Sequence, residues 1–239
     1  MSLAGLIYRL PGDFLSLLFP RVCQCCGEHL VKNEDIICTS CIYDIPVTDF
    51  HNRRDNELEK AFWGRCYIER AAAWAPYTRG GKVQRLIHRL KYLGIKEIGI
   101  YIGHHYGKIL KESGFLDGID VIVPVPLHPS RERRRGFNQA MVLSVAISDV
   151  SGIPVREDIL KRKRKTATQT RRTRVERWEN VENIFEVPGG ITCGDIHILL
   201  VDDVVTTGST IESCVNALKV IPGVRVSVVS AAVALSNTI

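Results

Sequence analysis

Two adjacent carboxylates and a cluster of hydroxyl side chains form the segment of this sequence with the clearest chemistry. Asp202 and Asp203 follow an apolar run at residues 198–201, and the small-residue loop TTGST follows at 206–210. This order predicts a buried strand, a loop at its carboxyl end and the start of a helix, which is where open α/β sheets bind ligands. The loop N–H groups, the hydroxyls and the helix dipole suit a phosphate dianion, whereas paired acids suit vicinal hydroxyls or magnesium. The segment therefore indicates a site for a sugar phosphate with free hydroxyl groups.

An arginine cluster forms a second candidate site, within residues 119–140. Residues 121–125 predict a central strand, which Pro124 and Pro126 bring to an end because proline donates no backbone hydrogen bond. Four arginines follow, at positions 131 and 133–135. Planar guanidinium groups bind pyrophosphate through two hydrogen bonds at once. Taken alone, the cluster would fit a solvated basic turn equally well, but its position after a strand favours an anion site.

A third stretch, residues 161–177, carries nine Lys or Arg residues and one acid. Residues 131–177 hold fourteen basic and five acidic residues, a net charge of +9, whereas the whole chain has a net charge of +6. The positive charge is therefore local. It suits a polyanion, and each phosphate that it neutralises would make binding more sensitive to salt. The residues that we expect to contact nucleic acid are Arg162, Lys163, Arg164, Lys165, Arg171 and Arg174.

Four cysteines have the spacing of a metal site. Cys23, Cys26, Cys38 and Cys41 form C-x2-C-x11-C-x2-C, and two such pairs can hold one zinc ion tetrahedrally. A closed set of four thiolates leaves no position for substrate, so the zinc would be structural. Cys25 stands between two expected ligands and could replace one of them, and reduced structural cysteines or disulfides are the alternative.

The remaining sequence predicts the elements that must position these residues. The chain has 239 residues with 45% hydrophobic composition, enough for one substantial α/β core and a small additional module. We expect an N-terminal helix and cysteine module at 1–48, a charged linker at 49–70, and the α/β domain at 71–239. A strand is expected over 71–77, and helical spacing of apolar residues predicts helices over about 83–93 and 96–112. No apolar run approaches the ~20 residues of a membrane span, and no signal peptide is evident, so we expect a cytoplasmic protein.

The segment 198–210 resembles the 5-phosphoribosyl 1-pyrophosphate (PRPP) motif of type I phosphoribosyltransferases. There, a hydrophobic strand is followed by two acids, two further residues and T-[TG]-G-[ST]-T, and every element is present here. The resemblance implies that Asp202 and Asp203, as catalytic residues, hold the ribose hydroxyls, and that magnesium accompanies PRPP. It also implies that the loop after the strand at 121–125 binds the leaving pyrophosphate. The expected PRPP site comprises Asp202, Asp203, Val204, Val205, Thr206, Thr207, Gly208, Ser209, Thr210, Pro126, Leu127, His128, Arg131 and Arg135.

Over essentially its whole length, the chain resembles the ComF-type competence protein family. The resemblance rests on the cysteine pairs, on P-V-P-L-H-P-x-R-x-x-x-R-G-F-N-Q, on V-D-D-V-x-T-T-G-S-T, and on R-x-x-x-T-x-x-Q-T-x-x-x-R at 162–174. It implies a zinc-finger module on a type I phosphoribosyltransferase-like fold, whose mostly parallel central sheet is flanked by helices. It further implies a loop at about 165–174 that closes over PRPP, and a role in natural transformation. The partners implied are single-stranded DNA and DNA-uptake machinery such as a helicase.

Two main classes of function compete, and a third, a zinc-stabilised adaptor with a vestigial site, would have no affinity for PRPP. The protein could bind PRPP or a phosphate backbone without turnover while it handles DNA. Alternatively, it could be an active, magnesium-dependent phosphoribosyltransferase that acts on an unidentified nucleobase or amine. The intact PRPP motif favours PRPP binding, and nothing in the sequence identifies a nucleobase pocket.

Overall fold

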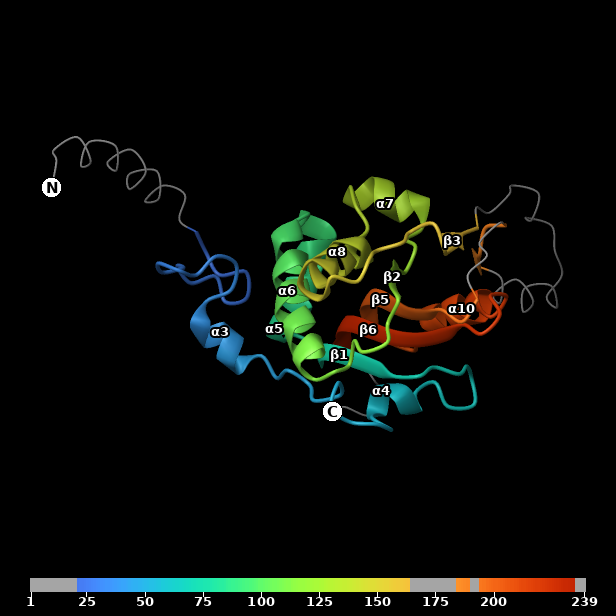
Figure 1. The fold of residues 1–239 in the computed structure, drawn as a ribbon. Coiled ribbons are helices and arrows are strands. Elements are labelled where there is room, and N and C mark those ends of the chain that lie inside the picture. Colours follow the sequence, from blue (N-terminus) through green and yellow to red (C-terminus); the bar gives the residue numbers. More distant parts are fainter. Residues whose placement is uncertain (1–20, 164–183, 190–193, 235–239) are drawn as a thin grey trace, which may run out of the picture.

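A computed structural model describes residues 21–163, 184–189 and 194–234 of the chain (Figure 1). The expected N-terminal helix and residues 164–177 of the basic stretch at 161–177 lie outside these residues. Among the described helices, none combines the length and apolar character needed to cross a membrane.

The core is a sheet of four parallel strands in the order β1-β6-β5-β2. The strands are β1 (Ala71–Pro76), β2 (Val121–Pro124), β5 (His197–Val205) and β6 (Arg225–Val233). They consist almost entirely of buried residues, which is typical of a parallel sheet covered on both faces. The expected parallel α/β architecture and the strand expected over 71–77 are thus confirmed.

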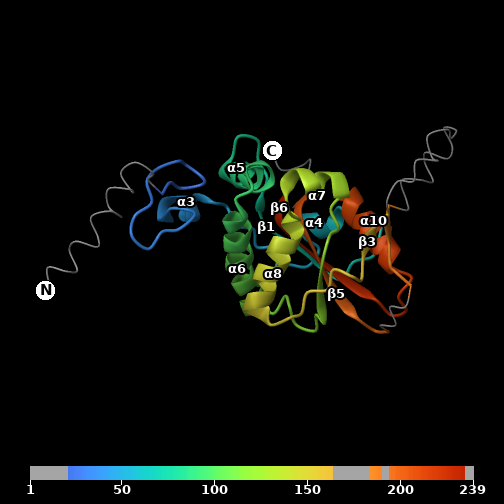
Figure 2. The same cartoon turned by 90° about the horizontal axis from the view of Figure 1, so that it is seen from above.

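Helices cover both faces of the sheet (Figures 1 and 2). Because successive side chains of a strand point to opposite faces, Leu199 and Val201 pack on one side with α6 (Lys96–Glu112) and α8 (Gln139–Ser151). Ile198 and Leu200 pack on the other side with α10 (Ser209–Leu218) and α4 (Glu57–Lys60). Helix α5 (Lys82–His88) continues into a π-helix, η1 (Arg89–Leu93), which ends at a left-handed Gly94. The remaining elements are α7 (Pro129–Arg135) and a short antiparallel pair, β3 (Lys161–Arg162) with β4 (Phe185–Glu186).

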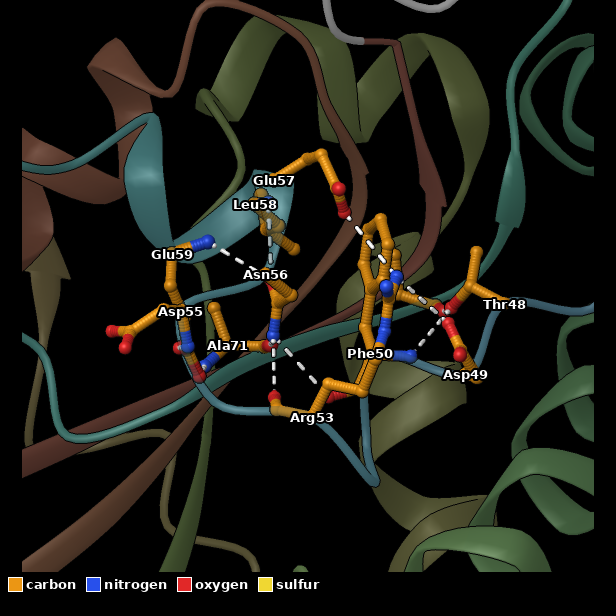
Figure 3. A network of polar contacts seen from close by, with 11 residues as sticks. Thr48, Asp49, Phe50, Arg53, Asp55, Asn56, Glu57, Leu58, Glu59 and Ala71 are labelled. Carbon is orange, nitrogen blue, oxygen red and sulfur yellow. Dashed lines mark hydrogen bonds and ion pairs between the residues drawn. The ribbon is translucent and has the colours of Figure 1, made fainter.

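The segment 49–70, expected to be a linker, is tied to the sheet (Figure 3). The Asn56 side chain caps α4 by accepting from the backbone N–H groups of Leu58 and Glu59, and it donates to the Ala71 carbonyl at 2.9 Å. The Glu59 carboxylate accepts from the Ala71 N–H at 3.0 Å. Leu58 and Phe62 are fully buried in the core beside α10. Part of this segment therefore belongs to the α/β core, while the domain boundaries themselves stay a prediction.

The cysteine-bearing segment packs against helices of the same core. It contains helix α3 (Thr39–Asp44), and buried Cys25 and Ile37 share one apolar cluster with residues of α5 and α6. Lys82 of α5 forms an ion pair with Asp44 at 2.7 Å, and Arg89 of η1 donates to the Gln24 side chain at 2.7 Å. This segment is thus fixed against the α5–η1 helix.

Candidate functional site

Strand β2 ends at Pro124 beside Val201 of β5, and β5 continues beyond the apolar run that was expected to form the strand, through the two acids to Val205. Val123 and Pro124 of β2 pair with Leu200 and Val201 of β5, so the loop that begins at Val125 starts beside Asp202. The end of β5 leads through residues 206–208 into α10, and the left-handed Gly208 precedes its first residue. Parallel packing thus brings the arginine loop and the acid–threonine segment to one place, at the carboxyl edge of the sheet.

A cavity of about 310 Å³ opens at this edge. Nine residues expected in the PRPP site line it: Pro126, Leu127, Arg131, Arg135, Asp202, Asp203, Val204, Thr206 and Thr210. The other five adjoin it in the chain without lining it. Val205 is buried beneath the loop, Thr207, Gly208 and Ser209 form the turn into α10, and His128 caps α7 by accepting from the Ser130 N–H.

The charges in the cavity are unequal in number. Four cationic side chains, Lys91, Arg131, Arg135 and Arg162, line it together with the two acids. Burial and the neighbouring charge of Asp203 raise the pKa of Asp202 to about 7, although the Asp203 N–H and Lys91 oppose the shift. Such a site attracts an anion with several negative charges, and its acids provide a separate position for hydroxyls or a cation.

Lys91 was not among the expected site residues. Its ammonium forms an ion pair with Asp203, with Nζ and Oδ1 2.7 Å apart and side chains 19% and 12% exposed. A signal was present in the sequence, because Lys91 lies four residues after Ile87 and eight after Val83. Those two residues are buried, so the spacing places a lysine on the inward stripe of the helix.

Arg65, which was also not among the expected site residues, contacts the loop at 206–210. Its guanidinium donates to the Thr207 carbonyl at 2.6 Å and forms an ion pair with Glu212 of α10 at 2.6 Å. Within the same loop, Gly208 has φ +75°, and a Cβ at that position would lie 2.8 Å from a ring carbon of Phe62. The segment 49–70 therefore shapes the loop at 206–210.

The described part of the basic stretch reaches the cavity through one side chain. Arg162 lines the cavity and lies over the Phe185 ring, with 5.2 Å from the guanidinium carbon to the ring centroid. Lys163 follows it and is exposed. Arg164, Lys165, Arg171 and Arg174 lie outside the described residues. The Phe185 ring beneath Arg162 is buried and belongs to the hydrophobic core.

The four expected metal ligands come together. The sulfur atoms of Cys23, Cys26, Cys38 and Cys41 all lie within 4.8 Å of one another. The backbone N–H groups of Cys25 and Cys38 donate to the Cys23 sulfur at 3.4 and 3.2 Å, as thiolate ligands commonly accept. Cys25 is buried in the apolar cluster and lies outside this set. Four thiols so arranged have the chemistry and spacing of a closed metal site.

No protein-family model matches the chain. It is 32% identical over 140 residues to "Competence protein F" of Haemophilus influenzae, covering 57% of this chain and 55% of that protein. It is 33% identical over 164 residues to "DNA utilization protein YhgH" of Salmonella typhimurium, covering 65% and 70%. It is 28% identical over 210 residues to "Competence protein ComFC" of Bacillus subtilis, covering 85% and 81%.

Solved structures similar to the chain include two of phosphoribosyl proteins. One is the glutamine PRPP amidotransferase from B. subtilis, at 18% identity and a TM-score of 0.41, covering 59% of this chain and 30% of that one. The other is a purine phosphoribosyltransferase from Pyrococcus horikoshii, at 15% identity and a TM-score of 0.37, covering 56% and 83%.

Fold and site together define a parallel α/β protein with a polar, largely cationic cavity at the carboxyl edge of its sheet and a four-cysteine segment before it. The sequence comparisons give the family, and the chain belongs to the ComF-type competence proteins. The match spans little more than half of the H. influenzae relative's length.

Proposed function

We propose that this protein binds PRPP in the cavity at the carboxyl edge of the sheet and uses this site in handling DNA. One observation carries the proposal: the cavity brings the two adjacent acids, two loop threonines and three arginines from separate segments into one space of about 310 Å³. A ligand with a sugar diol and phosphates at both ends matches that combination of donors and acceptors.

Each part of the site has a role in this proposal. Residues 206–210 and the N-terminus of α10 hold the 5-phosphate through backbone N–H groups and hydroxyls. Asp202 and Asp203 accept from the ribose hydroxyls, and Arg131 and Arg135 hold the pyrophosphate. Bound magnesium would neutralise part of the pyrophosphate charge, and the two acids are the residues that would hold it.

The DNA-handling role is supported by the names of the relatives, which are competence and DNA utilization proteins. It is also supported by Arg162, which lines the cavity, and by the basic sequence that follows it from Lys163 to Arg177. Single-stranded DNA would bind this face through its phosphates, in a salt-dependent manner. We further propose that the protein acts in natural transformation, in the cytoplasm, with DNA-uptake machinery such as a helicase.

For the cysteine cluster we propose a structural zinc ion. Cys23, Cys26, Cys38 and Cys41 would each supply a thiolate, which leaves no open coordination position for chemistry. The ion would fix the segment that packs on α5 and η1.

Calorimetric titration of PRPP with magnesium into the wild-type protein tests the proposal. We expect saturable binding to one site, lost in the double variant Asp202→Asn with Asp203→Asn, while Asp117→Asn, an exposed acid away from the cavity, binds as the wild type does. A subsequent assay for released pyrophosphate, with and without nucleobases or amines, separates the two functions. Release would make the protein an active phosphoribosyltransferase, and binding without release would favour a PRPP-binding protein. Absence of PRPP binding by the folded wild type would refute the proposal.

A further inference from the structure

Lys91 occupies an unusual position for a lysine. It lies on the same helical stripe as buried Val83 and Ile87 and points toward the end of β5, where its ammonium meets Asp203 at 2.7 Å. With the Lys91 and Asp203 side chains 19% and 12% exposed, both charges are largely removed from water. Partial burial of two charges is costly, and their mutual attraction only offsets that cost. A stability role alone gives a weak reason for this pair, whereas its place in the cavity gives a functional one.

The backbone around Lys91 is built to hold it there. Residues 89–93 form a π-helix between α5 and the left-handed Gly94, and such local widening of a helix occurs often at functional sites. Leu90, next to Lys91, is fully buried. On the other side, Arg85 donates to the Cys25 carbonyl and Arg89 donates to the Gln24 side chain at 2.7 Å. The helix is therefore fixed both by the core and by the cysteine-bearing segment.

Lys91 faces the negative charge of the two adjacent acids, Asp202 and Asp203. Asp202 and Asp203 are adjacent and partly buried, and the proposed ligand carries several negative charges. Two uncompensated carboxylates would repel that ligand, and at distances of a few ångström inside a protein such repulsion is substantial. In the cavity, Lys91 is the cationic group in ion-pair contact with Asp203, whereas Arg135 donates to the Gln139 side chain at 2.7 Å. Lys91 supplies a fixed positive charge where the acids meet the ligand.

We propose that Lys91 is a positioning residue for the sugar-phosphate ligand. Its ammonium holds the Asp203 carboxylate in place through the 2.7 Å ion pair, so that the carboxylate is oriented toward the ribose, and it supplies part of the positive charge that this carboxylate would otherwise draw from a divalent cation. PRPP binding by the wild type therefore depends less on magnesium than binding by a protein without this lysine. The inference rests on the proposed PRPP site and names a further residue of it.

The test is calorimetric titration of PRPP at two magnesium concentrations, one low and one saturating. We expect Lys91→Met to weaken PRPP binding about tenfold at low magnesium, as loss of a close charge pair does, and to regain much of the affinity at saturating magnesium. Lys91→Arg, which keeps the charge, should retain the PRPP affinity of the wild type and its weak dependence on magnesium. Lys108→Met removes an exposed lysine from α6 and leaves both unchanged.

If the wild type binds PRPP and both Lys91→Met and Lys91→Gln, folded by circular dichroism, bind it with the same affinity and magnesium dependence, the role of Lys91 is refuted while the site stands. If Lys91→Arg behaves as Lys91→Met does, the ammonium charge is not the operative property and the inference also fails. If the folded wild type binds no PRPP, the proposed function fails first and the inference falls with it.

Discussion

Replacing Gly208 by alanine perturbs the cavity loop at one defined point. Gly208 has φ +75°, a conformation that costs an L-residue about 1–2 kcal/mol. The new Cβ would also lie 2.8 and 3.2 Å from two ring carbons of Phe62 and 3.3 Å from the Arg65 guanidinium. Phe62 is fully buried in the cluster beneath α10, so its ring cannot move aside freely, and overpacking of this kind costs about 1–3 kcal/mol.

The two contributions together predict a loss of about 2–5 kcal/mol in the free energy of unfolding. For a chain of this size that corresponds to a fall in Tm of about 5–15 °C, measurable by thermal unfolding. Alternatively, the loop shifts away from Phe62 and the loss appears as weaker PRPP binding by the folded variant. Both readouts are therefore taken on the same preparation.

Gly152→Ala is a matched control. Gly152 ends α8 with φ +82°, and a Cβ there meets no atom within 4 Å, so this variant carries the conformational cost without the collision. We expect Gly208→Ala to exceed it clearly in Tm loss or in loss of PRPP affinity. Equal effects of the two substitutions on Tm, with PRPP affinity unchanged in both, would refute the argument that Phe62 constrains the loop.

Three further predictions concern the same site and the cysteine cluster. Arg65→Met removes the contacts to Thr207 and Glu212. Because the ion pair is about one-third exposed, we expect the free energy of unfolding to fall by about 1 kcal/mol and PRPP binding to weaken about fivefold. A PRPP titration in which Arg65→Met matches the surface control Arg53→Met would contradict this. Burial raises the pKa of Asp202 from 3.8 to about 7, so the native state binds more protons than the unfolded state between these values and stability falls as pH rises through that window, by at most about 1.4 kcal/mol per pH unit. Urea unfolding at pH 5 and pH 8 measures this dependence, and Asp202→Asn should show a smaller fall in the free energy of unfolding between the two pH values than the wild type. An equal fall in both proteins would count against the prediction. Cys38→Ser should lower the bound zinc measured by elemental analysis, whereas Cys25→Ser should keep it at one ion per chain; zinc loss in Cys25→Ser alone would reverse the ligand assignment.

The features that sequence reasoning predicted are those encoded by neighbouring residues. The strand and loop at 198–210 show their character within thirteen positions, because the apolar run, the acids and the hydroxyl cluster follow one another directly. The two cysteine pairs have the same property. Position at the carboxyl edge of a parallel sheet then follows from general rules of α/β folds, so the arginine loop and the acids could be expected near each other.

The contributions of Lys91 and Arg65 could not be predicted in the same way. Arg65 meets Thr207 across 142 positions, and it lies in a charged segment whose composition indicates a linker. That segment packs because Leu58 and Phe62 are buried and because Asn56 and Glu59 bind β1. These contacts depend on tertiary packing that composition does not express. Lys91 did leave a trace, as a charge on an apolar stripe, but its partner Asp203 is identified only by the fold.

The helix formed by α5 and η1 contacts both the cysteine-bearing segment and the cavity of the α/β core. Along its twelve residues, Arg85 and Arg89 bind the cysteine-bearing segment, and Lys91 reaches Asp203 in the cavity. A structural metal ion would hold the loops that present the Cys25 carbonyl and Gln24, and so would fix the helix that carries Lys91. A metal ion held by the four cysteines would therefore act on the proposed ligand site through this helix, although it leaves no open coordination position for a ligand. The cysteine segment and the α/β domain would therefore both contribute to the proposed ligand site, through the helix at 82–93 that contacts them both.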